Sequence, residues 1–565
     1  MVNESLMSRF LPIVSWLPKC TSKTVRADVV AGIAVAGLLV PEGMAYAGIA
    51  GVPPQVGLYA AMAGMFVYAL FGTSRQLAVT STSSSAALVA AAVAPLASTD
   101  PIRYVSLVSA AAIVAGVVFL SGGLLKLGSV SEFVSKPVLK GFVFGLGLTI
   151  IVKQLHHLLG IPAGHGAFFG QLRDVIRQLL ETNVFTLAIG VFAIATIFLI
   201  GAYARRVPSA LVVLVLGILA VRLFGLEQHG VAVVGDIQAR MPSLHVPRVG
   251  TNDLPELFVD VLGIVVVLTA EALAAGRTFA SKHKYSIDPN QELLAMGTAN
   301  LASGLLGGMI VGGGMSGTAA NDSSGARTQL STIVGALLVA LTIGFLLPSI
   351  RLLPEAVLAA IVVHAVAHLV DVKQLKYYAQ MRTGSLWGAL TAICGVLLLG
   401  ILRGLIVAVA LTLVVVMKKL STPQDSLLGR LPGTTKYLDI ERHPEAEPIE
   451  GILIFRPNGM LFFANAHRIS SRVRQLVKPP ENLTAFVMDL EASPEIDVTS
   501  LEMLAELNEE LAENGITLYF AKVPDRVVDL FSRSGFLATL GPYRIFHGVD
   551  DAVRQAQSRS NSRAA

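Results

Sequence analysis

Apolar stretches long enough to form membrane helices recur along this chain from Val29 to Met417. A helix of about 20 such residues crosses the roughly 30 Å hydrocarbon core of a bilayer. Charged residues make up only 14% of the 565 residues and hydrophobic residues 53%, which is typical of a protein with many membrane spans. The sequence therefore predicts an α-helical, multi-pass membrane protein.

The basic residues of the apolar region form clusters between the predicted spans, the last at Lys418 and Lys419. A count of about fourteen segments places every cluster on one side, as the positive-inside rule requires. The predicted segments lie near 28–49, 54–71, 80–95, 104–124, 137–158, 184–203, 208–224, 257–280, 290–308, 316–325, 329–347, 354–370, 384–401 and 404–420. Segments 80–95 and 316–325 are too short and polar for ordinary spans and occupy corresponding places in the two halves. This pattern predicts an inverted seven-plus-seven repeat.

The composition changes after Met417, where hydrophobic runs become short and alternate between strand-like and helical spacing. This alternation predicts a small α/β domain on the cytoplasmic side of the last span. The brief loops suggest a bacterial inner membrane protein. The predicted parts are a cytoplasmic N-terminal segment at 1–25, a transmembrane domain at 26–420, a linker at 421–450, the α/β domain at 451–557 and a disordered tail at 558–565.

Two acidic residues interrupt long apolar runs: Glu42 within Val29–Ile49 and Glu271 within Leu257–Ala280. A carboxylate at the centre of a membrane helix costs roughly 2.5–3.5 kcal/mol on insertion scales, so its presence indicates function. A polar, broken segment follows each acid, and paired broken helices indicate the central binding site of a transporter. We expect Pro41 to break the first helix beside Glu42.

The two broken segments are expected to point their helix N-termini at each other near the middle of the membrane. Such ends bind anions through unpaired N–H groups and a partial positive charge. The predicted substrate-binding residues are Glu42, the pocket-shaping Tyr46, the hydroxyl donors Thr80, Ser81 and Thr82, and the backbone donors Gly314, Met315, Ser316, Gly317 and Thr318. The alternative is that these small residues only allow close helix packing.

Several function classes are disfavoured by the sequence. No nucleophile–base pair or metal-ligand spacing is apparent, so we expect neither an enzyme nor a cofactor. The net charge of +5 is explained by basic loops rather than by nucleic-acid binding.

Three ordered motifs identify a family. The runs Pro41–Ala47 (PEGMAYA), Gly51–Tyr59 (GVPPQVGLY) and Phe71–Val79 (FGTSRQLAV) closely resemble the sulfate permease (SulP) family of anion transporters. The runs Gly459–Ala466 and Asp497–Thr499 resemble the sulfate-transporter and anti-sigma-factor-antagonist (STAS) domain. The resemblance implies core and gate bundles, a homodimer, and an anion site between the broken helices.

Two positions depart from the family pattern. Gly317 stands where many members have Arg, which weakens the assignment to sulfate and favours a singly charged anion such as bicarbonate, or cation-assisted binding. Glu42 stands where members often have Gln, and a carboxyl group donates a hydrogen bond only when protonated.

Glu271 and Glu42 are the predicted ion-coupling residues. A buried carboxylate can cycle between protonated and charged states, while a static ion pair with Arg277, or a sodium site at Glu271, are the alternatives. We therefore expect a secondary active transporter of a small anion, with sulfate leading and bicarbonate or a C4-dicarboxylate close, coupled to protons and working by an elevator mechanism. The alternatives are a sodium-coupled bicarbonate symporter, a nucleobase permease of the same fold, and a membrane-anchored STAS signalling receptor.

The α/β domain contains a candidate regulatory site at Asp497 and Thr499. Thr499 falls at the phospho-acceptor position of the Asp-x-[Ser/Thr]-Gly pattern of anti-sigma-factor antagonists, but Ser500 replaces the Gly. A scaffolding or dimer-stabilising role is therefore favoured over a phosphorylation switch or nucleotide sensing, with a cytoplasmic regulatory partner as a further expectation.

Overall fold

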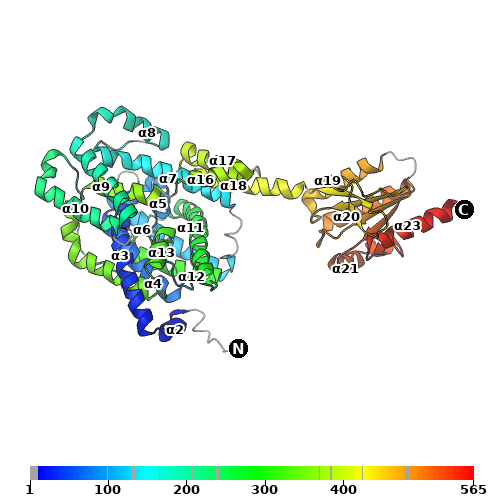
Figure 1. Cartoon of the computed structure of the whole chain (residues 1–565), viewed down its shortest axis with the longest axis horizontal. Coiled ribbons are helices and arrows are strands. Elements are labelled where there is room, and N and C mark those ends of the chain that lie inside the picture. The colour runs from blue at the N-terminus through cyan, green and yellow to red at the C-terminus, as the bar shows by residue number, and fades with distance from the viewer. Residues whose placement is uncertain are drawn as a thin grey trace. The chain divides into compact units, whose positions relative to one another are not determined.

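The computed structural model describes residues 11–97, 100–128, 135–164, 166–204, 208–235, 241–250, 252–367, 369–381, 385–422, 424–478 and 483–564, apart from the side chains of 348, 349, 402, 405 and 560–564. The chain forms two compact units, Met1–Thr412 and Leu413–Ala565. The first unit is helical, and the second is an α/β domain (Figure 1).

The first half of the helical unit contains α2 (Ile13–Trp16), η1 (Leu17–Lys19), α3 (Ser22–Ala50), α4 (Pro54–Phe71), β1 (Val79–Thr80), α5 (Ser83–Ala97), α6 (Pro101–Leu124), α7 (Lys136–Leu159), α8 (Phe168–Arg177), η3 (Leu179–Glu181), α9 (Val184–Tyr203), α10 (Ser209–Phe224) and η4 (Leu226–His229). Two boundaries differ from prediction. The side chain of Thr21 caps α3, so the first helix begins within the expected N-terminal segment 1–25. Pro41 lies inside α3 and does not end it, which corrects the expected break.

The second half contains α11 (Leu254–Lys282), α12 (Pro289–Leu305), β2 (Gly312–Gly313), α13 (Met315–Ser323), α14 (Leu330–Leu341), η5 (Thr342–Leu346), η6 (Leu347–Leu352), α15 (Glu355–Ala367), α16 (Val372–Met381), α17 (Ser385–Leu399) and α18 (Ile401–Ser421). Among the described residues, seven helices are long and apolar enough to cross a membrane, and four shorter apolar helices accompany them. The count of fourteen stays a prediction.

Close backbone approach holds the helices at the centre of this unit together. A Cβ added at Gly57 on α4 would lie 2.0 Å from the carbonyl oxygen of Gly43 on α3, so only glycine fits this crossing. Small residues at helix contacts are typical of membrane bundles, where tight packing replaces the hydrophobic effect. The same central region joins α3 and α11 to both short helices, α5 and α13 (Figure 1).

The second unit contains a six-stranded sheet in the order β4-β3-β5-β6-β7-β8. Its strands are β3 (Asp425–Arg430), β4 (Tyr437–Asp439), β5 (Ile452–Pro457), β6 (Ala485–Asp489), β7 (Thr517–Ala521) and β8 (Ile545–Phe546), and its helices are α19 (Phe463–Val477), α20 (Val498–Glu513), α21 (Asp525–Arg533), α22 (Phe536–Leu540) and α23 (Val549–Ala564). Strands β5 to β8 are parallel, while β3 pairs antiparallel with both β4 and β5. Separate apolar clusters form with α19 to α22 and with α23, as expected for a sheet covered on both faces.

Two predicted boundaries of this unit are wrong. The expected linker 421–450 contributes β3 and β4, so the sheet begins before residue 451. The expected disordered tail 558–565 is helical as far as Ala564, because α23 continues from its contacts with the sheet.

Candidate functional site

The two broken segments meet through a pair of very short strands. Strand β1 precedes α5, strand β2 precedes α13, and the two pair antiparallel with Val79 opposite Gly313 and Thr80 opposite Gly312. Each short helix therefore begins within a few residues of the same strand pair. The prediction that the two segments meet is confirmed.

The N-terminus of α5 has a reciprocal cap. The backbone N–H of Thr82 donates to Ser85 Oγ (2.9 Å), and the N–H of Ser85 donates to Thr82 Oγ1 (3.1 Å). This arrangement satisfies two donors at the helix start. Thr82 is thus a capping residue, and its hydroxyl is already engaged.

Thr80 and Ser81, just before this cap, differ from Thr82. Their hydroxyl oxygens are buried and have no hydrogen-bond partner among the described residues. Nearly all buried polar groups in proteins are hydrogen-bonded, so unpartnered hydroxyls on two consecutive residues need an explanation. A bound ligand would provide one.

The N-terminus of α13 offers backbone donors. Gly314 is the N-cap, and the first backbone bond within the helix runs from the Thr318 N–H to the Gly314 carbonyl (3.3 Å). The N–H groups of Met315, Ser316 and Gly317 therefore lack partners within the helix. Thr318 does not fit its predicted role as a backbone donor, because its N–H is used inside the helix.

The remaining α13 side chains are placed by packing. The hydroxyl of Thr318 donates to the Gly314 carbonyl (2.6 Å) and accepts from the Ala78 N–H (3.2 Å), which ties α13 to the strand before α5. A Cβ at Gly317 would lie 3.2 Å from Leu39 of α3, so this position faces a helix contact. The side chain of Met315 is 43% exposed.

Glu42 and Tyr46 lie one turn apart on α3, and both are buried. The Tyr46 hydroxyl interacts with the Glu42 carboxyl group and with the Ser316 hydroxyl. The acid of the first half is thus linked to the first turn of the short helix of the second half.

Glu271, in the second half of the chain, contacts the short helix of the first half. Ser84 Oγ, in the first turn of α5, donates to Glu271 Oε1 on α11 (2.8 Å). Each predicted coupling residue is thus linked to the short helix of the opposite half of the chain, Glu271 directly through Ser84 and Glu42 indirectly through Tyr46.

Two further acids, absent from the predicted site, hold the loops beside the short helices. Asp28 on α3 accepts hydrogen bonds from the Arg327 N–H (2.6 Å), the Thr328 N–H (3.2 Å) and the Thr328 hydroxyl (2.6 Å), after α13. Glu292 on α12 accepts from the Thr73 N–H (2.8 Å), the Thr73 hydroxyl (2.6 Å), the Ser74 N–H (3.1 Å) and the Tyr68 hydroxyl (2.6 Å), before α5. Both residues could have been found from the sequence, because each is an acid at the start of an apolar run.

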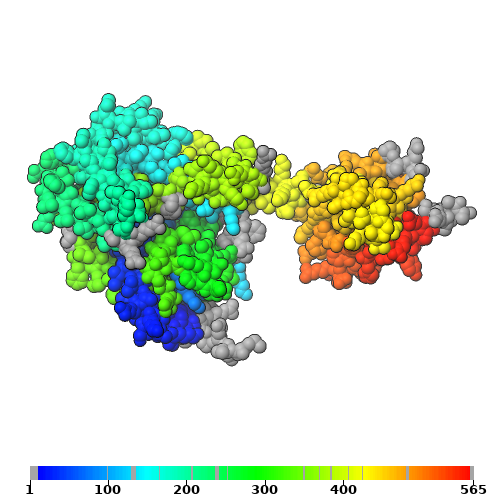
Figure 2. All heavy atoms as spheres, viewed as in Figure 1, coloured from blue at the N-terminus to red at the C-terminus, as the bar shows by residue number. Residues whose placement is uncertain are grey.

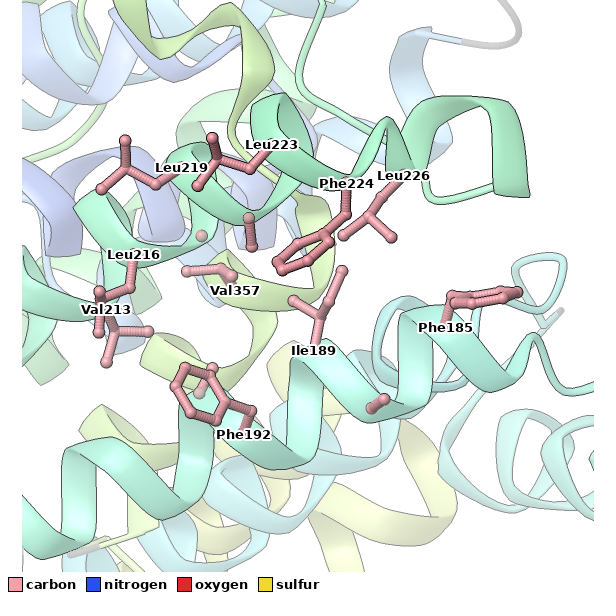
Figure 3. A pocket seen from close by; sticks show the side chains of 14 residues that line it. Phe185, Ile189, Phe192, Val213, Leu216, Leu219, Leu223, Phe224, Leu226 and Val357 are labelled. Carbon is pink, nitrogen blue, oxygen red and sulfur yellow. The ribbon is translucent and has the colours of Figure 1, made fainter.

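A separate cavity of about 510 Å³ lies between α9 and α10 and is lined mainly by their side chains. Figure 3 shows Phe185, Ile189 and Phe192 of α9 facing Leu223 and Phe224 of α10. All of its lining side chains are apolar, so it offers an anion no partner.

The predicted regulatory residues lie at the start of α20. Asp497 caps this helix by accepting from the Ser500 N–H (2.8 Å), and it also accepts from the Phe463 N–H at the start of α19 (2.7 Å). Burial alone would raise the pKa of Asp497, but the hydrogen bonds from Ser500 and Phe463 outweigh it and lower the pKa. Thr499 is exposed in the first turn. A regulatory role for either residue stays a prediction.

The buried Asp550 of this domain is held by side chains. Asp550 accepts from Arg554 Nε (2.8 Å) and from the Tyr437 hydroxyl (3.1 Å). Burial alone would raise the pKa of Asp550, but the bonds from Arg554 and Tyr437 lower it. Burial and the bond to Asp550 raise the pKa of Tyr437 to about 12.

These features define a multi-pass membrane protein with two half-helices meeting at a candidate anion site and a cytoplasmic STAS domain. The model of the sulfate permease family matches residues 25–393, and that of the STAS domain matches residues 443–552. The chain belongs to the sulfate permease family, which consists of transporters rather than enzymes.

Named relatives agree with this assignment, and solved structures share the fold. A probable sulfate transporter of Mycobacterium tuberculosis is 33% identical over 537 residues, covering 94% of this chain and 96% of the relative. Sulfate transporter 1.1 of Arabidopsis thaliana is 30% identical over 577 residues, covering 96% and 87%. The murine solute carrier 26 family member A9 anion transporter, in its inward-facing state, shares the fold with a TM-score of 0.89 at 23% identity, covering 97% and 94%. The transmembrane domain of a cyanobacterial bicarbonate transporter, BicA, aligns with a TM-score of 0.61 at 25% identity, covering 69% and 98%.

Proposed function

We propose that this chain is a secondary active transporter that carries a small oxyanion between the N-termini of α5 and α13 and couples its movement to protons. The observation that carries the proposal is the pair of buried, unpartnered hydroxyls of Thr80 and Ser81 beside these helix ends. Hydroxyl and backbone donors around a helix N-terminus suit an anion. Sulfate is the leading substrate, since relatives covering nearly the whole chain are named as sulfate transporters.

The charges around the site favour proton coupling. Glu42 and Glu271 are the charged residues of the predicted set, and both are acidic. A carboxylate about 4 Å from an anion costs about 4 kcal/mol of repulsion at an effective dielectric constant of 20. Protonation of the carboxyl groups removes this repulsion, so anion and proton should bind together.

The movement that we propose is an elevator-like shift of a core against a gate. The core consists of α3, α5, α11 and α13, which contact one another around the site. The gate includes α7, α9, α15 and α17, which form a second connected set of helices. Because the anion contacts come from the core, the site would travel with it. We further propose a homodimer, on the basis of the family resemblance.

A sodium-coupled bicarbonate transporter is the second candidate. It is favoured by the alignment with the transmembrane domain of a bicarbonate transporter and by glycine at position 317, where many family members carry Arg. Without that fixed charge, a singly charged anion needs less compensation. Sodium would then be held by oxygen ligands near Glu271.

Uptake into proteoliposomes tests these proposals. We expect labelled sulfate to accumulate when the outside is more acidic, without sodium, and more than labelled bicarbonate, fumarate or uracil. Thr80→Val should weaken sulfate uptake at least tenfold, since a hydrogen bond to a charged group contributes about 1.5–3 kcal/mol. Thr196→Val is the matched control, because this hydroxyl bonds to the Phe192 carbonyl on α9 (2.8 Å).

Other outcomes would contradict the proposal in distinct ways. Sulfate flux that ignores the proton gradient would exclude proton coupling, and accumulation of bicarbonate under a sodium gradient would favour the second candidate. Uptake of uracil alone would indicate a nucleobase permease. Removal of residues 424–565 should leave anion uptake measurable, whereas a signalling receptor without transport would show none in either form.

A further inference from the structure

A second cavity, which is polar and has a volume of about 730 Å³, lies under the N-terminal arm formed by α2 and η1. Four segments line it: the arm with the start of α3, the loop after α4, the loop before α12, and the loop after α13. The arm is among the blue atoms of the first unit in Figure 2, which also include α3, and α2 contacts α4. By the positive-inside rule, we expect all four segments on the cytoplasmic side of the membrane domain.

The lining of this cavity is electropositive. Lys19, Arg75 and Arg327 come from three different segments, and Asp288 is the one acid among the lining residues. Asp288 caps α12 by accepting from the N–H groups of Asn290 (2.9 Å) and Gln291 (3.4 Å), so part of its charge is already compensated. Among the lining side chains, basic groups therefore outnumber acids by three to one, and they are not grouped along one helix. Asp28 and Glu292 lie behind the lining, where hydroxyl and backbone N–H donors compensate their charge.

The floor of the cavity is rigidly built. Its loop after α4 is held by Glu292, and its loop after α13 is held by Asp28, through the buried hydrogen bonds described above. The guanidinium group of Arg75 lies over the ring of Tyr285, 4.8 Å from its centre. Two of the three basic residues thus sit on fixed backbone, and the third, Lys19, lies on the arm above them.

The size of the cavity indicates what it can hold. Its volume equals that of about two dozen water molecules at about 30 Å³ each. A tetrahedral oxyanion alone would leave most of this space empty, whereas a phosphate ester with its carbon skeleton would fill more of it. Trp16 adds an aromatic face, and Ser15 and Thr24 add hydroxyl groups to the lining.

We propose that this cavity binds an organic phosphate, either the headgroup of an anionic phospholipid or a soluble phosphate ester, which joins the N-terminal arm to the loops flanking α5 and α13. The arm itself suits a membrane surface, because Val14 and Leu17 beside Trp16 are each 45% exposed. A bound phosphate would bridge Lys19 to Arg75 and Arg327. This cavity contains none of the residues of the proposed transport site, so its test does not depend on the transport proposal.

The two tryptophans of the chain provide a direct assay. Trp387 is 73% exposed on α17, and Trp387→Phe leaves Trp16, which lines the cavity, as the single tryptophan, excited selectively at the red edge of its absorption. The full-length variant is titrated with glycerol 3-phosphate in detergent and, separately, reconstituted in nanodiscs with increasing phosphatidylglycerol in phosphatidylcholine. We expect a saturable change in Trp16 emission in at least one arm: in the first for a soluble ester, in the second alone for a lipid headgroup.

A matched pair of substitutions tests the specificity of binding. Lys19→Gln removes a lining charge and should weaken binding about fivefold, which corresponds to about one basic contact with an anionic surface. Lys23→Gln removes a charge from the exposed first turn of α3, outside the lining, and should leave binding unchanged. No saturable change in either arm, or equal weakening by the two substitutions, would overturn the proposal. Both positions are exposed, so neither substitution threatens folding.

Discussion

The contact between Ser84 and Glu271 allows the proposed proton coupling to be tested without removing the carboxyl group. In Ser84→Ala, Glu271 loses the hydroxyl that donates to its Oε1 at 2.8 Å. A hydrogen bond to a charged group contributes about 1.5–3 kcal/mol, and the lower end applies because this pair is only partly buried. One pH unit corresponds to about 1.4 kcal/mol. Loss of the bond favours the protonated carboxyl group, so the pH midpoint of uptake should move about one unit towards alkaline pH.

The assay is initial-rate sulfate uptake into proteoliposomes over a range of external pH, with the internal pH fixed. Ser121→Ala is the control, because this exposed hydroxyl on α6 bonds to the Val117 carbonyl (2.8 Å) in its own helix, away from both acids. It should leave the midpoint unchanged. An unchanged midpoint in Ser84→Ala, at normal protein folding, would refute Glu271 as the group whose protonation controls uptake. A shift towards acidic pH would equally contradict the reasoning.

Glu292→Ala should destabilise the membrane domain by at least about 3 kcal/mol, measured as a lower thermal midpoint in detergent, because four donors lose their acceptor; an unchanged midpoint would contradict this. Gly57→Ala should abolish folding, seen by size-exclusion chromatography, because its Cβ would lie 2.0 Å from the Gly43 carbonyl, while Gly48→Ala has open space and should fold normally. Asp550→Asn should destabilise a soluble fragment of residues 424–565 by about 1 kcal/mol at pH 7, since its partner Arg554 is largely exposed. The lowered pKa of Asp550 means that this difference exists above about pH 4 and disappears as the pH falls below it; urea unfolding that shows a constant difference down to pH 3 would refute the assignment.

The broken segments could be predicted because their polarity conflicts with their surroundings. Thr80–Ser85 and Gly312–Asn321 are polar runs between apolar spans, and the structure places both at the paired strands β1 and β2. The strand pair itself was not predictable, because two-residue strands leave no periodic pattern in the sequence. Pro41 illustrates the reverse error, since a membrane helix can continue through a proline when neighbouring groups satisfy the freed carbonyl.

The errors in the C-terminal domain have a different cause. Strands β3 and β4 lie in a charged segment rich in proline, where the alternation of buried and partly buried positions is short. The stability of β3 comes from pairing with β5, which lies more than 20 residues away in the chain, and β4 in turn pairs with β3, so local propensity does not decide either strand. Helix α23 was missed similarly, because Val549, Val553 and Ala556 pack against the sheet while the rest of its sequence is polar.

The crossed contacts at the candidate site have a consequence for coupling. Glu42 reaches the start of α13 through Tyr46, and Glu271 reaches the start of α5 through Ser84, so neither half of the chain can form the site alone. Asp28 and Glu292 also join the two halves, because each accepts hydrogen bonds from a loop of the opposite half. An anion between the two helix ends would therefore interact with both acids at once. Because linkage is reciprocal, a proton on either acid should strengthen anion binding by the same factor by which the anion strengthens proton binding.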